Sequence, residues 1–78
     1  MDNMTVDYKC IGGRIKKFRR QNKLTQAKLA ELTDMSDTYI SRIESGVKKA
    51  SLNSLVKIVN VLDITLDAIV GENSKTDK

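Results

Sequence analysis

The chain has 78 residues, a length that suffices for one small domain, and its 40% apolar content without proline or tryptophan favours an aliphatic helical bundle over a sheet. It carries 14 lysines and arginines against 10 aspartates and glutamates, which makes it mildly basic and compatible with an anionic partner. No apolar run approaches the ~20 residues that span a membrane, Cys10 has no second cysteine to pair with, and no signal-peptide pattern opens the chain, so we expect a reducing cytoplasm.

The residue types also argue against enzymatic and metal-binding functions. The chain has no histidine, and its single cysteine has no base beside it in the sense of a catalytic motif. No cluster of cysteine or aspartate has the spacing of metal ligands. We therefore expect no catalytic residue, no metal and no cofactor, and no small-molecule ligand is evident.

The first helix is predicted over about residues 8–21, after a flexible lead over residues 1–7 in which Asp7 serves as N-cap. Its buried stripe is formed by Ile11, Ile15 and Phe18. Asn22 is expected to take the left-handed conformation that ends the helix. Gly12 and Gly13 each weaken the helix by ~1 kcal/mol relative to alanine, so we interpret them as residues that permit close packing.

Positive charge is concentrated at this end of the chain. Between Tyr8 and Ala30 there is no acidic residue, and the cations are Lys9, Arg14, Lys16, Lys17, Arg19, Arg20, Lys23 and Lys28. Such a field attracts a polyanion, and the alternative is a solvated helix face that keeps a small protein soluble.

The stretch over residues 24–46 predicts two short helices joined by a tight turn. Thr25 is an N-cap for the first, which places Leu29 and Leu32 on one face with Ala30 beside them. The periodicity breaks over residues 33–35, so a helix-turn-helix arrangement is expected.

The second of these helices begins after the N-cap Ser36 and ends at Gly46. Tyr39, Ile40 and Ile43 restore the helical repeat, and the two isoleucines are expected to face the core. The opposite side then carries hydroxyls and a guanidinium, from Thr38, Ser41, Arg42 and Ser45.

A buried ion pair is predicted between Arg19 and Glu44. Arg19 follows Ile15 by four residues and so lies on or beside the buried stripe, where an unpaired charge is costly. Glu44 follows Ile40 by four residues and has the opposite charge. We expect a bidentate pair that orients the first helix against the helix over residues 36–45.

Two further helices complete the predicted bundle. Ser51 caps a helix over residues 52–62 with a stripe of Leu52, Leu55, Ile58, Val59 and Leu62, and Thr65 caps a short helix through Val70 that ends at Gly71. Residues 72–78 are expected to form a polar disordered tail.

This pattern resembles the Cro/cI-like (XRE) family of helix-turn-helix regulators over about residues 8–71. The residues that carry the resemblance are Gln26, Ala30, Met35, Ser36, Ile40, Ile43, Glu44 and Gly46. The resemblance implies an all-α, five-helix lambda-repressor-like DNA-binding domain, and it also implies the ion pair between Arg19 and Glu44. The family usually has glycine in the turn where this chain has Asp34, which is expected to adopt a left-handed conformation.

The resemblance implies a repressor that binds a double-stranded DNA operator. The candidate base contacts are Asp37, Thr38, Ser41 and Arg42. The candidate backbone contacts are Gln26, Ser36, Tyr39, Arg14, Lys17, Lys28, Lys48 and Lys49. The alternatives are a helix-stabilising role for Asp37, a core-flanking role for Tyr39, and ordinary loop charge for the last two lysines.

The resemblance also implies a homodimer with a seam of Val61, Ile64, Leu66 and Ile69, although the helix after Thr65 is also expected to close the bundle. A different kind of function remains open, namely a protein-interaction module or an antitoxin-type partner-binding protein on the same fold. That alternative predicts an apolar outward face on the helix over residues 36–45.

Overall fold

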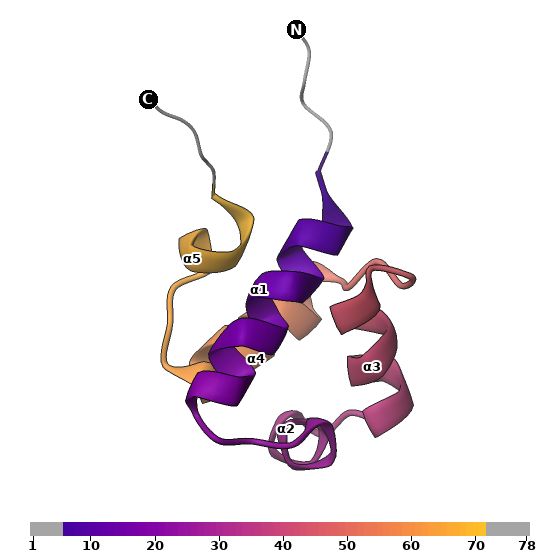
Figure 1. The fold of residues 1–78 in the computed structure, drawn as a ribbon, viewed down its shortest axis with the longest axis vertical. Coiled ribbons are helices and arrows are strands. Elements are labelled where there is room, and N and C mark those ends of the chain that lie inside the picture. Colours follow the sequence, from indigo (N-terminus) through magenta and orange to yellow (C-terminus); the bar gives the residue numbers. More distant parts are fainter. Residues whose placement is uncertain (1–5, 72–78) are drawn as a thin grey trace, which may run out of the picture.

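The computed structural model describes residues 6–71, so residues 1–5 of the predicted lead and the whole predicted tail lie outside the described residues. The described residues form five helices and no strand (Figure 1). The helices are α1 (Tyr8–Gln21), α2 (Gln26–Thr33), α3 (Asp37–Ser45), α4 (Leu52–Leu62) and α5 (Asp67–Val70). The predicted all-α class is confirmed. None of these helices is long and apolar enough to cross a bilayer.

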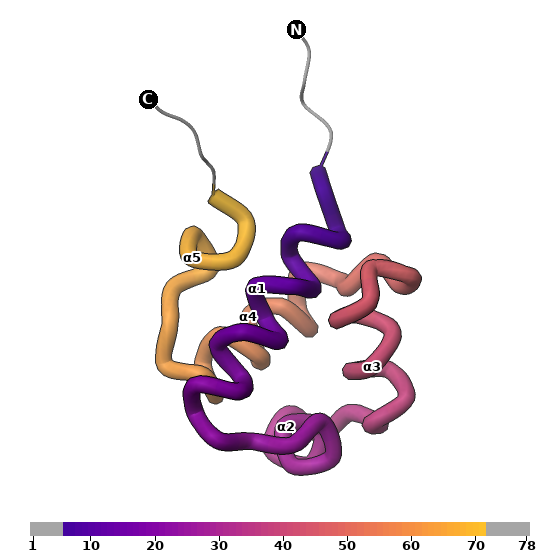
Figure 2. The backbone as a smooth tube through the Cα atoms, in the orientation of Figure 1, coloured from indigo at the N-terminus to yellow at the C-terminus, as the bar shows by residue number. Residues whose placement is uncertain are grey.

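Helix α1 crosses the middle of the domain and organises the others around it. It packs against α3, α4 and α5, while α2 packs against α3 and α4. In Figure 1, α3 and α5 lie on opposite sides of α1, and α4 lies behind it. The backbone tube in Figure 2 passes from α2 into α3 through a short turn, so these two helices meet steeply.

Side chains that the sequence nominated as N-caps start the first four helices. Asp7 accepts from the N–H groups of Lys9 and Cys10, both at 3.1 Å. Thr25 and Ser36 each accept from the N–H three residues later at 3.0 Å, and Ser51 does the same at 3.1 Å. Each cap satisfies backbone donors that have no partner within the helix.

Left-handed residues end α1 to α4. Asp34 (φ 59°) takes this conformation as expected, and Gly46 (φ 82°) ends α3. The expectation for Asn22 is wrong, since its φ is −86° and the left-handed residue is Lys23. This arrangement lets the Leu24 N–H reach the Arg19 carbonyl at 3.1 Å, the bond that closes a Schellman motif.

The core is aliphatic and draws on every helix. Its fully buried side chains are Ile15, Leu29, Ile40, Ile43, Ile58, Leu62 and Ile69. Two expected core residues are instead exposed, Leu32 by 49% and Leu52 by 65%. On α2 the inward row runs through Leu29 and Thr33, whose hydroxyl donates to the Leu29 carbonyl at 2.7 Å. Leu52 begins α4, one turn before the part of that helix that is buried.

The short α5 closes the bundle. It begins at Asp67, although the Thr65 hydroxyl still accepts from the Ala68 N–H at 3.3 Å. Ile69 is fully buried in the chain's own core, so its assignment to a dimer seam is wrong. The other three seam candidates, Val61, Ile64 and Leu66, are half-buried against the same core.

Candidate nucleic-acid interface

Helix α3 is held against α1 at a backbone contact. A methyl group at Gly12 would lie 2.7 Å from the Glu44 carbonyl oxygen and closer still to that of Ile43. Only glycine therefore allows the two helices to approach this closely. Gly13 is different, because a methyl group there would meet nothing within 4 Å, and our expectation of close packing is wrong for this residue.

The predicted bidentate ion pair joins the same two helices. Arg19 donates from Nε to Glu44 Oε2 at 2.6 Å and from Nη2 to Glu44 Oε1 at 3.0 Å. Its Nη1 donates to the Leu24 carbonyl at 2.7 Å. The side chains are only 8% and 2% exposed, so the pair is well protected from solvent. It connects α1, α3 and the segment that leads into α2.

Gln26 extends this network in a way that the sequence did not predict. Its Nε2 donates to Glu44 Oε1 at 3.1 Å, an oxygen that also accepts from Arg19. The two residues are 18 positions apart on different helices, so no local spacing indicates the contact. The amide retains one N–H and its carbonyl oxygen for other partners.

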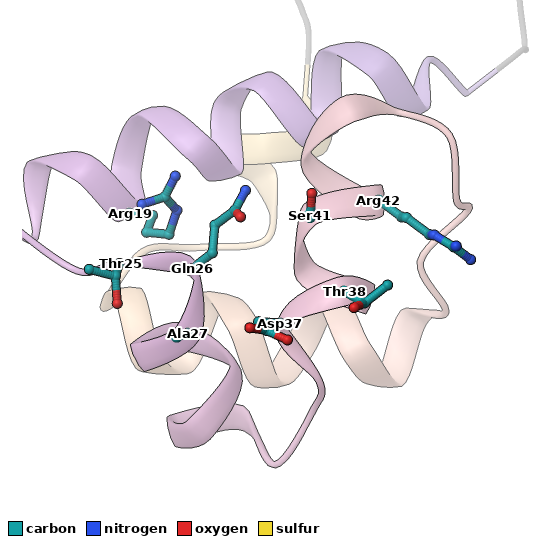
Figure 3. A pocket seen from close by; sticks show the side chains of 8 residues that line it. All are labelled: Arg19, Thr25, Gln26, Ala27, Asp37, Thr38, Ser41 and Arg42. Atoms are coloured by element: carbon teal, nitrogen blue, oxygen red, sulfur yellow. The ribbon is translucent and has the colours of Figure 1, made fainter.

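An open groove of about 610 Å³ lies beside this network, between the start of α2 and the outer side of α3. Its lining residues are Arg19, Thr25, Gln26, Ala27, Asp37, Thr38, Ser41 and Arg42 (Figure 3). The structure thus brings together the four candidate base contacts, all of them exposed. No large apolar side chain lines the groove, and Arg42 extends away from α3.

Several candidate backbone contacts lie on exposed surface of α2, of α3 and of the loop after α3. The exposed Ser36 caps the start of α3, and Lys28 at the first turn of α2 has its Nζ 3.3 Å from Glu31 Oε1. Lys48 and Lys49 are exposed in the loop after α3, and Lys49 Nζ lies 5.8 Å from the centroid of the Tyr8 ring.

Three other candidates are placed differently. Arg14 donates from Nη1 to the carbonyls of Ile69 (3.1 Å) and Gly71 (2.9 Å), so it holds α5 on the side of α1 away from α3. Lys17 lies over the ring of the next residue, with its Nζ 5.5 Å from the centroid. The half-buried Tyr39 bonds Ser54 Oγ at 3.1 Å, which agrees with its alternative, core-flanking role.

Comparison with known proteins identifies the domain. A family model described as Helix-turn-helix (HTH_3) matches residues 15–69, which is more than half of the chain. The chain belongs to this helix-turn-helix family. The resemblance to Cro/cI-like regulators is thereby confirmed, and the helix-turn-helix itself comprises α2 and α3.

Similar proteins include a phage repressor and HTH-type transcriptional regulators. The immunity repressor protein of Bacillus phage phi105 is 41% identical over 64 residues, covering 82% of this helix-turn-helix chain and 44% of the repressor. The HTH-type transcriptional regulator SinR of Bacillus licheniformis is 31% identical over 68 residues, covering 86% of this chain and 61% of SinR. The chain thus spans about half the length of these relatives.

Two solved structures have the same fold. The restriction-modification controller protein C.AhdI from Aeromonas hydrophila is 28% identical, with a TM-score of 0.78 over 81% of this chain and 96% of that one. A structure of SinR in complex with DNA is 32% identical, with a TM-score of 0.72 over 76% of this chain and 95% of that one.

Proposed function

We propose that this helix-turn-helix protein is a transcriptional regulator that binds double-stranded DNA sequence-specifically and acts as a repressor. The observation that carries the proposal is the outer side of α3, which is polar, exposed and bordered by an open groove. A helix of this kind fits the major groove, where each base pair presents a distinct pattern of donors and acceptors. The names of the phage repressor and of DNA-bound SinR support it further.

Arg42 is the strongest candidate for reading a base. Its exposed guanidinium can donate two bonds to guanine O6 and N7, a contact worth ~1–3 kcal/mol of discrimination. Thr38 and Ser41 offer hydroxyls to either kind of base edge, and Thr38 also offers a methyl group to thymine. The Asp37 carboxylate can accept a hydrogen bond from a base amino group, such as that of cytosine. Phosphates repel its charge, so it should favour binding only where such an amino group is present.

Contacts to the sugar-phosphate backbone would set the position of α3. The start of α2 presents free N–H groups at a positive helix end, next to Gln26 and Lys28. Ser36, Lys48 and Lys49 supply further donors near α3. If six phosphates are neutralised per dimer, the logarithm of affinity falls with the logarithm of salt concentration at a slope of about −5.

We further propose that the protein binds as a homodimer, since operators for such folds are paired half-sites about one DNA turn apart. The half-buried Val61, Ile64 and Leu66 are the remaining candidates for the seam. A duplex target also fits the cytoplasmic location expected from the sequence. The alternative of a protein-interaction module is less favoured, because the outward face of α3 lacks the apolar side chains it requires.

Selection of bound duplexes from a random pool tests the proposal. The wild-type protein should enrich one motif, and the spacing of repeated half-sites reports the dimer. Arg42→Ala should lose the preference for one base pair while keeping the rest of the motif. Lys57→Ala, an exposed residue of α4, is the control and should leave the motif unchanged. Failure of the wild-type protein to enrich any sequence would refute the proposed function.

A further inference from the structure

Two contacts divide the surface of α1 into a side that faces α3 and a side that faces α5. On one side, Gly12 packs against the backbone of α3 and Arg19 reaches the groove. On the other, Arg14 donates to the carbonyl groups at the end of α5. These contacts show which of the exposed cations of α1 lie on the side that faces α3.

Helical spacing assigns Lys9, Lys16 and Arg20 to the α3 side. Lys9 precedes Gly12 by three residues, Lys16 follows it by four, and Arg20 lies four residues further along. A direct contact supports the assignment of Lys9, whose Cα would lie 2.8 Å from a methyl group at Gly46, where α3 ends. Lys17, by contrast, follows Arg14 by three residues and lies on the α5 side.

All three cations are exposed, and Lys9 lies close enough to the Asp7 carboxylate to help lower the pKa of that group. No ion pair joins Lys9, Lys16 or Arg20 to another residue of the range 6–71. Like charges four residues apart, such as Lys16 and Arg20, destabilise a helix slightly. Arg20 in the last turn of α1 is favoured by the helix dipole, but its repulsion with Lys16 remains, and an anionic partner would remove that repulsion.

We propose that Lys9, Lys16 and Arg20 form a phosphate-binding edge on α1. It contacts the sugar-phosphate backbone beside the major groove that α3 enters. Lys9 and Arg20 are eleven positions apart, which is about 16 Å along the helix, and a DNA strand carries one phosphate per ~3.4 Å of its axis. The edge is thus long enough to follow several phosphates. This inference rests on the proposed DNA binding and adds residues of α1 to it.

Neighbouring lysines on α1 make a matched test possible. The variants are Lys16→Gln, Arg20→Gln and the double variant, and the controls are Lys17→Gln on the same helix and Lys57→Gln on α4. Each single variant removes one exposed positive charge. Lys9 is left unchanged because it also packs against Gly46. Affinity is measured from about 0.05 to 0.5 M salt on the selected duplex and on an unrelated duplex.

For each bound protomer, one lost phosphate contact should reduce the salt slope by ~0.9 and lower affinity at 0.1 M salt by about 8-fold. The double variant should lose about twice the slope. Both duplexes should be affected alike, because backbone contacts carry no sequence information, and the selected motif should not change. Lys17→Gln and Lys57→Gln should keep the wild-type slope, and thermal melts should show that all variants fold.

The inference is overturned if Lys16→Gln and Arg20→Gln match the control variants, or if they weaken only the selected duplex. If the affinity of the wild-type protein for both duplexes does not depend on salt, the proposed DNA binding itself is refuted, and this edge with it. The two failures are therefore distinguished by the behaviour of the wild-type protein.

Discussion

The buried pair of Arg19 and Glu44 offers the sharpest test of what holds α3 against α1. The single variants are Arg19→Met and Glu44→Leu, and the double variant carries both changes. Arg19→Met removes two of the three donors to the Glu44 carboxylate and leaves Gln26 as its remaining partner. Glu44→Leu leaves the guanidinium with only the Leu24 carbonyl.

Burial sets the expected magnitude. With side chains only 8% and 2% exposed, either single variant leaves a charge that water solvates poorly, and removal of one partner from such a pair costs ~3–5 kcal/mol. A chain of this length has a total stability of about 4–12 kcal/mol, so each single variant should lose a large fraction of it. The double variant leaves no unpaired charge, so its cost should be clearly smaller than the sum of the two.

The free energy of unfolding can be measured by urea titration followed by circular dichroism, in a fixed concentration of a stabilising osmolyte so that every variant remains folded at the start. A coupling energy above ~1.5 kcal/mol is expected for Arg19 and Glu44. The exposed pair of Lys28 and Glu31, with side chains 52% and 70% exposed, is the control and should couple by less than ~0.5 kcal/mol. Additive effects at the buried pair would refute the reasoning.

Two further predictions concern α1. Gly12→Ala should lower the free energy of unfolding, because the added methyl group meets two carbonyls of α3. Gly13→Ala should raise it by ~1 kcal/mol, because alanine has the higher helix propensity and the methyl group meets nothing. Equal effects of the two variants in thermal melts would contradict this difference. The N–H of Cys10 holds the pKa of Asp7 below its usual 3.8, so Asp7 contributes stability above that pH and loses it as pH falls through the lower folded-state pKa. Asp7→Ala should therefore show a weaker loss of stability in acid than the wild-type protein, as followed by melts between about pH 2 and 6.

Local patterns predicted much of the fold correctly. The caps at Asp7, Thr25, Ser36 and Ser51 act within a few residues of themselves, so their types and positions suffice to identify them. The ion pair was also predictable, because a charge on the buried side of one helix, such as Arg19, requires an opposite charge on the buried side of a neighbouring helix, such as Glu44.

Other features depend on where neighbouring helices lie. Periodicity placed Leu32 and Leu52 near an apolar face, but it cannot tell how far another helix covers that face. In the same way, α1 has cations on two sides, and only the contacts of Gly12 and Arg14 reveal which side meets α3. The sequence therefore indicated a positive field that includes Lys16 and Arg20, but it could not assign these cations to one side of α1.

The close approach of backbones at Gly12 has a consequence for recognition. Helix α3 is held to α1 by main-chain contact and by a buried ion pair, and these contacts oppose a tilt of α3 toward differently shaped sites on the proposed DNA target. When a duplex does not match its geometry, the DNA must bend or twist instead, and the energy of that deformation depends on base steps the protein never touches. For the proposed homodimer, flexible steps such as TA between the half-sites should therefore strengthen binding.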